Sequence, residues 1–178
     1  MPHRIFLPLV LSALGLVAGG CTSWKLSQPA APPITPLAAA PHHTAKVCVV
    51  RTSVLGQAVT FPTRDNGVLV GATRGRGHFC WFAEPGEHDI DIEADEVEHA
   101  HVTAVAGRAY FLKQEVDNVF GYVKCRAVWL EAREAKDAFD DTPYETLSGV
   151  PGSEKLPELT TNVPARNHAA AVSGAAAD

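Results

Sequence analysis

Two histidines separated by one residue are the feature of this sequence best suited to chemistry. His99 and His101 flank Ala100, and residues two apart in a β-strand point to the same side. Two imidazoles placed in this way could share a zinc ion with nearby carboxylates. The nearby carboxylates are those of Glu93, Asp95, Glu96 and Glu98. A metal site needs three or four convergent ligands and the spacing places only this pair. We therefore favour a solvated polar edge of a strand and expect no metal cofactor.

A third histidine, His88, follows the turn sequence Pro85-Gly86-Glu87. It alternates with Ile90 and Ile92, which places it on the apolar side of a strand. A histidine in such a place could act as a general base. The simpler interpretation, which we favour, is that its ring bonds a backbone carbonyl and fixes the turn.

The sequence between residues 45 and 140 offers few nucleophiles. Ser53 lies in a loop-like stretch without the Gly-x-Ser-x-Gly elbow of serine hydrolases. The cysteines Cys48, Cys80 and Cys125 lie in apolar, strand-like stretches, where a thiol packs as a small hydrophobic group. An oxidising compartment would permit one disulfide, but the sequence does not choose among the three pairings. Core packing of free thiols is the favoured interpretation, and no catalytic residue is predicted.

A glycine-rich stretch, GATRGRG, extends from Gly71 to Gly77. It lacks the Gly-Lys-Ser/Thr ending of a phosphate-binding loop. Arg74 and Arg76 could bind an anion, but arginines on an exposed turn are the simpler interpretation. These observations predict a protein that is not an enzyme and has no cofactor.

The fourth cysteine, Cys21, stands at the end of an N-terminal leader. A basic residue, Arg4, precedes the uncharged apolar run Ile5–Val17, and three small residues separate this run from the cysteine. This order is typical of a secretory signal peptide, and the run is shorter than the roughly 20 apolar residues of a spanning helix. We therefore predict a signal peptide over residues 1–20.

The sequence Ala18-Gly19-Gly20 directly before Cys21 resembles the lipobox of bacterial lipoproteins. The resemblance implies that the Cys21 thiol receives diacylglycerol, that the leader is cleaved before Cys21, and that the new amine is acylated, for example with palmitate. It departs from the family pattern at Ala18, where Leu is most frequent. The alternative is ordinary secretion with Cys21 free or in a disulfide. Two or more acyl chains hold a protein durably on a membrane, so we expect Cys21 to be a lipid attachment site.

The residue after Cys21 indicates the membrane to which a bacterial lipoprotein is sent. In enteric-type bacteria, Asp at this position retains lipoproteins in the inner membrane, whereas this chain has Thr22. The resemblance therefore implies the periplasmic face of the outer membrane.

Removal of residues 1–20 would leave 158 residues with 14 basic and 20 acidic side chains, a net charge of −6. Such a charge disfavours nucleic acids and anionic lipid headgroups as partners. It favours solubility and excludes little else.

Composition divides the rest of the chain into three parts. Residues 21–44 are rich in Pro and Ala, which predicts a lipidated cysteine followed by an extended spacer. Residues 45–140 contain the periodic apolar pattern of a folded domain. Residues 141–178 have few apolar side chains and scattered Pro and Gly, which predicts a disordered tail.

The central part has the pattern of a mainly β domain. Turn signals containing glycine separate about seven short segments with β-branched, aromatic or alternating residues, which favours a small antiparallel β-sandwich. The segments are KVCVVR, GVLVGAT, GHFCWFAE, EHDIDIEA, HVTAVA, RAYFLKQEV and FGYVKCRAVWL. EAREAKDAF, from Glu131 to Phe139, has the apolar spacing of one short helix.

Several stretches resemble an uncharacterised family of bacterial envelope lipoproteins. They are VCVVR, FCWFAEPGEHDIDI, VAGRAYFL and VWLEAREAKDAF. The resemblance implies the β fold and an envelope location, and it supplies no catalytic residue. We therefore expect a lipid-anchored, non-enzymatic envelope module that binds an envelope protein or the cell wall, or supports an assembly. A periplasmic lipoprotein that binds a metal or a small ligand is the alternative. The sequence does not indicate the oligomeric state.

Overall fold

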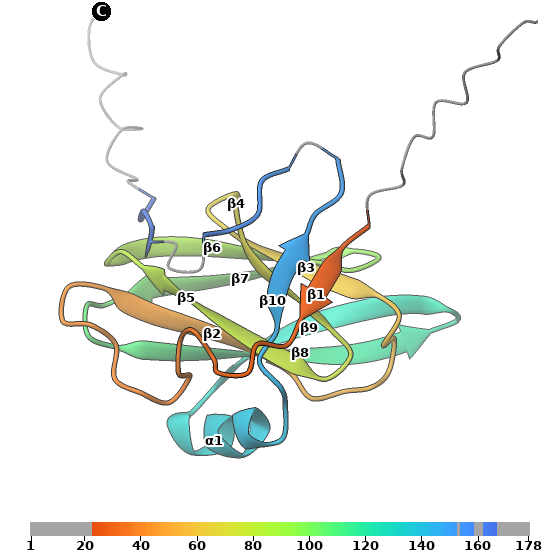
Figure 1. Cartoon of the computed structure of the whole chain (residues 1–178), viewed down its shortest axis with the longest axis horizontal. Coiled ribbons are helices and arrows are strands. Elements are labelled where there is room, and N and C mark those ends of the chain that lie inside the picture. The colour runs from red at the N-terminus through yellow and green to blue at the C-terminus, as the bar shows by residue number, and fades with distance from the viewer. Residues whose placement is uncertain (1–22, 153, 159–161, 167–178) are drawn as a thin grey trace, which may run out of the picture.

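The computed structural model describes residues 23–152, 154–158 and 162–166 of the chain (Figure 1). The predicted signal peptide over 1–20, the predicted lipid attachment site Cys21 and its neighbour Thr22 lie outside the described residues. None of the helices in the described ranges is long and apolar enough to cross a membrane.

Eleven strands and one helix make up the described part of the chain. They are β1 (Lys25–Ser27), β2 (Ala45–Arg51), β3 (Thr60–Asp65), β4 (Val68–Arg74), β5 (Gly77–Ala83), β6 (Gly86–Glu93), β7 (Val97–Ala104), β8 (Ala109–Val119), β9 (Tyr122–Leu130), α1 (Ala132–Asp140), β10 (Thr146–Gly149) and β11 (Asn162–Val163). The prediction of a mainly β domain with one short helix is confirmed.

The strands form two main sheets and a two-stranded ribbon. One sheet has the order β11-β5-β2-β8-β9, the other has the order β4-β3-β6-β7, and the ribbon pairs β1 with β10. Most pairs are antiparallel, but β2 pairs with β8 and β5 pairs with β11 in parallel. The sequence pattern did not reveal the parallel pairs, because alternation shows which side of a strand is buried and not the direction of its neighbour.

The main hydrophobic core lies between the two sheets. The alternation predicted for β6 is present, since His88, Ile90 and Ile92 are buried and the residues between them are partly exposed. From the five-stranded sheet, Trp81 and Leu112 pack in the same core cluster as these isoleucines. Burying side chains of this size stabilises the fold by about 1.5–3 kcal/mol each.

Two further layers cover the outer faces of the sheets (Figure 1). Ala135 and Phe139 of α1 pack with Val50 and Phe111 of the five-stranded sheet. The β1–β10 ribbon lies over β4, where Leu147 packs with Leu69. The molecule is therefore a sandwich with an additional layer on each side.

The structure differs from the expected spacer over 21–44 in its described part, residues 23–44. Ile34 is buried in a cluster with α1. The ammonium group of Lys46 donates hydrogen bonds to the carbonyls of Thr35, at 2.8 Å, and Ala38. Burial lowers the pKa of Lys46 to about 8. The proline-rich segment therefore packs through a few apolar side chains and backbone carbonyls.

The expected disordered tail over 141–178 also differs, because its described residues include β10 and β11. Leu147 of β10 and Val163 of β11 are buried. These strands have four and two residues, too short for an alternating pattern to be recognised in the sequence.

Two of the cysteines form a disulfide, so the interpretation of all three as free thiols in the core is wrong. Cys48 and Cys80 lie directly opposite each other in the antiparallel pair of β2 and β5, and their sulfur atoms are bonded. The β3–β4 hairpin separates these strands in the chain, so the sequence did not show that they are neighbours. Cys125 is the unpaired cysteine of the described residues, and burial raises its pKa to about 12.

Candidate functional site

His99 and His101 lie on the exposed side of β7, as predicted, and each faces a carboxylate of β6. The Nδ1 atoms of His99 and His101 lie 2.7 Å from Oδ1 of Asp91 and Asp89, respectively. Nε2 of His101 lies 2.5 Å from a carboxylate oxygen of Glu87. The hydrogen bond that His101 donates to Asp89, and then the one that it donates to Glu87, raise the pKa of His101. The two histidines therefore form cross-strand polar pairs on an edge strand.

The four carboxylates that could have completed a metal site each bond a group other than the two histidines. Glu93 pairs with Arg64, Asp95 accepts from the Val123 N–H, Glu96 pairs with Lys124, and Glu98 accepts from the Ala127 N–H. Among the residues that the structure describes, no group of three or more His, Cys, Asp and Glu could hold a metal ion. The arrangement is that of the polar edge favoured from the sequence.

His88 is fully buried and belongs to a network that holds three strands together. Its Nε2 lies 2.8 Å from the carbonyl oxygen of Glu84, which confirms the prediction that its ring fixes the turn. Its Nδ1 lies 2.7 Å from Asp65, which also accepts the indole N–H of Trp81 at 2.8 Å. Burial alone would lower the pKa of His88, but the Asp65 carboxylate outweighs it and the pKa is raised. The sequence pattern did not indicate Asp65 as the partner of this histidine.

The other predicted candidates bond backbone groups. Arg74 donates to the carbonyl of Trp24 and Arg76 to the carbonyl of Asp141. The Ser53 hydroxyl accepts the backbone N–H of Leu55 at 3.0 Å. These contacts agree with the simpler interpretation given for the two arginines.

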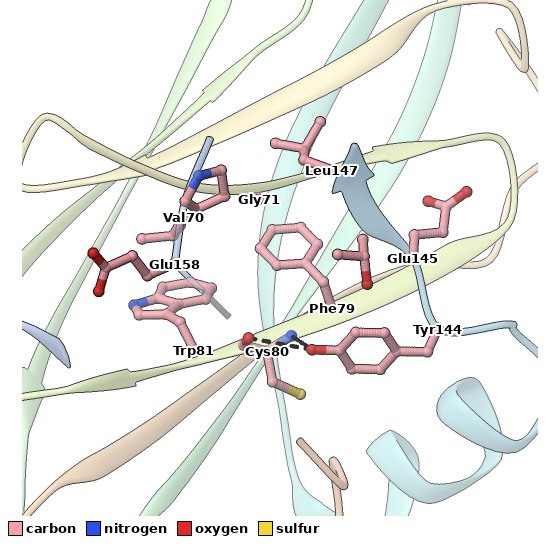
Figure 2. A pocket seen from close by; sticks show the side chains of 11 residues that line it. Val70, Gly71, Phe79, Cys80, Trp81, Tyr144, Glu145, Leu147 and Glu158 are labelled. Carbon is pink, nitrogen blue, oxygen red and sulfur yellow. Dashed lines mark hydrogen bonds between the residues drawn. The ribbon is translucent and has the colours of Figure 1, made fainter. Parts of the chain in front are cut away.

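A small cavity lies between β5, β10 and residues 157–158 (Figure 2). Phe79, Trp81 and Tyr144 contribute rings to its wall, and the Tyr144 hydroxyl accepts the backbone N–H of Cys80. Its volume is about 30 Å³, which is close to that of one water molecule. The cavity is too small for a substrate.

Glu145, which lines this cavity, is the most perturbed carboxyl group of the described residues. Only 5% of its surface is exposed, and burial raises its pKa to about 7. The backbone N–H of Arg74 donates to its Oε2 at 3.0 Å. A β-carbon on Gly77 would lie 2.2 Å from this carboxylate. Glu145 is therefore held in a space that requires glycine opposite it.

An open groove of about 590 Å³ lies between β7, the start of β8 and the junction of β9 with α1. Tyr110 and Trp129 contribute its aromatic wall, with ring centroids 6.4 Å apart and edge-to-face. Arg108 and Glu131 contribute exposed charged groups. The sequence predicted Tyr110 and Trp129 only as strand residues, because the contact between their rings depends on the register of β8 and β9.

A second exposed aromatic feature is the turn between β8 and β9. Phe120 is 99% exposed, with a φ angle of 52°, and Tyr122 is 64% exposed. A side chain with a left-handed backbone and no burial contributes nothing favourable to the fold.

Comparison with known proteins adds no relative: no protein-family model, no curated protein and no solved structure matches this chain.

Proposed function

We propose that this chain is a lipid-anchored, non-enzymatic module of the bacterial envelope that binds another envelope component or supports an assembly. The observation that carries the proposal is the position of Cys21. It follows an apolar leader and three small residues, and it stands four residues before the first strand at Lys25.

Cys21 and β1 are only four residues apart in the sequence, which limits how far the domain can lie from a lipid on Cys21. A chain spans at most about 3.6 Å per residue, so four residues reach about 14 Å. A lipid on Cys21 would hold the domain directly beside the membrane surface. The partner would then be a component of the layer next to the membrane.

The side chains that could act in catalysis are bonded to neighbours inside the fold, which supports a non-enzymatic role. His88 and Asp65 bond each other inside the core. The ring of His78 contacts the Thr142 hydroxyl at 2.9 Å and packs edge-on against Phe139. Burial lowers the pKa of His78 to about 4, so this histidine is a neutral structural group at physiological pH.

The proposed location is the periplasmic face of the outer membrane. It rests on Thr22, which is not the Asp associated with retention in the inner membrane. The disulfide between Cys48 and Cys80 suits an oxidising compartment.

Substitution of Cys21 tests lipid anchoring. The wild-type protein should enter the detergent phase on Triton X-114 partitioning and incorporate radiolabelled palmitate in cells. Cys21→Ser should lose both properties and accumulate with its leader attached. Cys125→Ser is the matched control, because Cys125 is the unpaired thiol of the described domain, and it should behave as wild type. A Cys21→Ser protein that is still labelled and cleaved would refute the proposal.

A further inference from the structure

We infer that the groove formed by residues 101–103, 108–111 and 129–132 binds a saccharide that carries a carboxylate. The inference rests on the proposed envelope function, and it names the class of component that the module binds. We refer to this feature as the β7–β9 groove. Its volume of about 590 Å³ lies within the range of roughly 300–1,000 Å³ typical of small-molecule sites.

The aromatic wall of the β7–β9 groove is fixed before any ligand arrives. The Tyr110 hydroxyl donates to the carbonyl of Thr103 at 3.2 Å and accepts the N–H of Val105 at 3.0 Å. Trp129 meets the Tyr110 ring edge-on and remains 38% exposed. A partly exposed indole that packs against a second ring can stack on the apolar face of a sugar ring.

Two hydrogen-bond donors beside this wall are available to a ligand. Within the described part of the chain, the Arg108 guanidinium makes no hydrogen bond or ion pair, and neither does the Trp129 indole N–H. An arginine can bind a carboxylate through two parallel hydrogen bonds. The indole N–H can donate to a sugar oxygen, and the exposed carboxylate of Glu131 can accept from a hydroxyl. Donors, an acceptor and an aromatic surface in one groove match an acidic saccharide.

A peptide added as a further strand is a poorer match. Strand addition needs free backbone N–H groups along a sheet edge. On β9, the side chains of Asp95 and Glu98 already accept the N–H groups of Val123 and Ala127. These carboxylates block the edge that such a peptide would extend.

The test is calorimetric titration of the full-length chain in detergent micelles with a cell-wall disaccharide, N-acetylglucosaminyl-N-acetylmuramic acid. Its muramic residue carries a carboxylate. Wild-type protein should bind this disaccharide at least tenfold more tightly than the neutral disaccharide of N-acetylglucosamine. Arg108→Ala should abolish that preference, and Trp129→Ala should weaken binding of both sugars at least tenfold. Trp129→Phe should restore part of the loss.

Arg133→Ala is the matched control, because Arg133 is an exposed arginine of α1 and does not line the groove. It should bind as wild type. Equal binding of the acidic and neutral sugars by wild type, unchanged binding by Trp129→Ala, or no binding of either sugar would each overturn the inference. Binding by Cys21→Ser separates the two proposals, since a failure of lipid anchoring leaves sugar binding unaffected and a failure of sugar binding leaves anchoring unaffected.

Discussion

At the scale of single residues, the buried polar network around Asp65 is expected to contribute to stability. Asp65 and His88 are fully buried, and Asp65 accepts from both His88 and Trp81. The carboxylate therefore satisfies two donors that have no access to water. A buried pair of this kind is costly to break, because the remaining partner is left without compensation.

Asp65→Ala should lower the free energy of unfolding by about 3–5 kcal/mol, since it leaves the His88 ring and the Trp81 N–H unsatisfied. Guanidinium denaturation at pH 7 measures the change. Asp91→Ala is the control, because Asp91 makes a comparable bond to His99 at the surface, and its effect should stay below about 1 kcal/mol. Similar effects of the two substitutions would show that the buried network adds no special stability.

Glu145→Gln should change how stability depends on pH. The folded pKa of Glu145 is raised to about 7, so the unfolded chain loses this proton first. Ionisation therefore lowers the wild-type free energy of unfolding as pH rises from about 4.5 to about 7, by about 3 kcal/mol in total. Gln does not ionise, so the variant should gain stability over wild type between pH 4 and pH 8.

Wild type and variant must be compared because His78 changes the free energy of unfolding with pH in the opposite direction. Its folded pKa is lowered to about 4, so it stabilises the fold as pH rises from about 4 to about 6.5. Urea denaturation of both proteins at pH 4 and pH 8 cancels this contribution. A constant difference between the two proteins would mean that Glu145 titrates normally.

The sequence predicted residue positions better than residue partners. It placed His88 on the inner side of its strand and predicted its bond to a backbone carbonyl. It did not reveal Asp65 as its partner or Cys80 as the partner of Cys48. Alternation determines the side on which a residue lies, whereas the partner depends on the register between strands that are distant in the chain.

At the scale of elements, the β1–β10 ribbon is the clearest addition to the sequence prediction. Trp24 and Leu26 pack with Leu147 over β4, although this part of the chain was expected to be a spacer. Strands of three or four residues in proline-rich surroundings show no periodicity. All strands of seven or more residues, β2 and β4 to β9, overlap a segment predicted from the sequence, whereas the six-residue β3 does not.

Leu147→Ala should lower the free energy of unfolding by about 2–3 kcal/mol, because Leu147 is 7% exposed and its loss leaves a cavity beneath the ribbon. Thermal unfolding followed by circular dichroism measures the effect. Leu156→Ala, at a leucine that is 47% exposed, should change it by less than about 0.5 kcal/mol. If Leu147→Ala is equally silent, the ribbon contributes nothing to stability.

The hairpin turn between β8 and β9 predicts a substitution that stabilises. Phe120 has a φ angle of 52° and is 99% exposed, and the left-handed backbone costs an L-residue about 1 kcal/mol. Phe120→Gly should therefore keep or raise the melting temperature, measured by differential scanning calorimetry. Tyr122→Gly, at the first residue of β9, should lower it, because glycine has a low propensity for strands and a higher entropic cost of ordering. A clear loss of stability in Phe120→Gly would show that its ring makes contacts that stabilise the fold.

At the scale of the whole molecule, the described part of the chain presents two exposed aromatic surfaces. The β7–β9 groove and the Phe120 turn lie on a sandwich whose outer faces are partly covered by α1 and by the β1–β10 ribbon. The described chain packs into the fold from Trp24 onward. The proposed anchor would therefore limit how far the groove can move from the membrane.

The central claim is that Cys21 becomes the lipidated first residue of the mature protein. The most direct measurement is the intact mass of the protein extracted from membranes with detergent, followed by fragmentation of its N-terminal peptide. The proposal predicts a chain that begins at Cys21 and carries a diacylglycerol thioether, together with an amide-linked acyl chain. An unmodified Cys21, or a mature chain that begins at another residue, would contradict it.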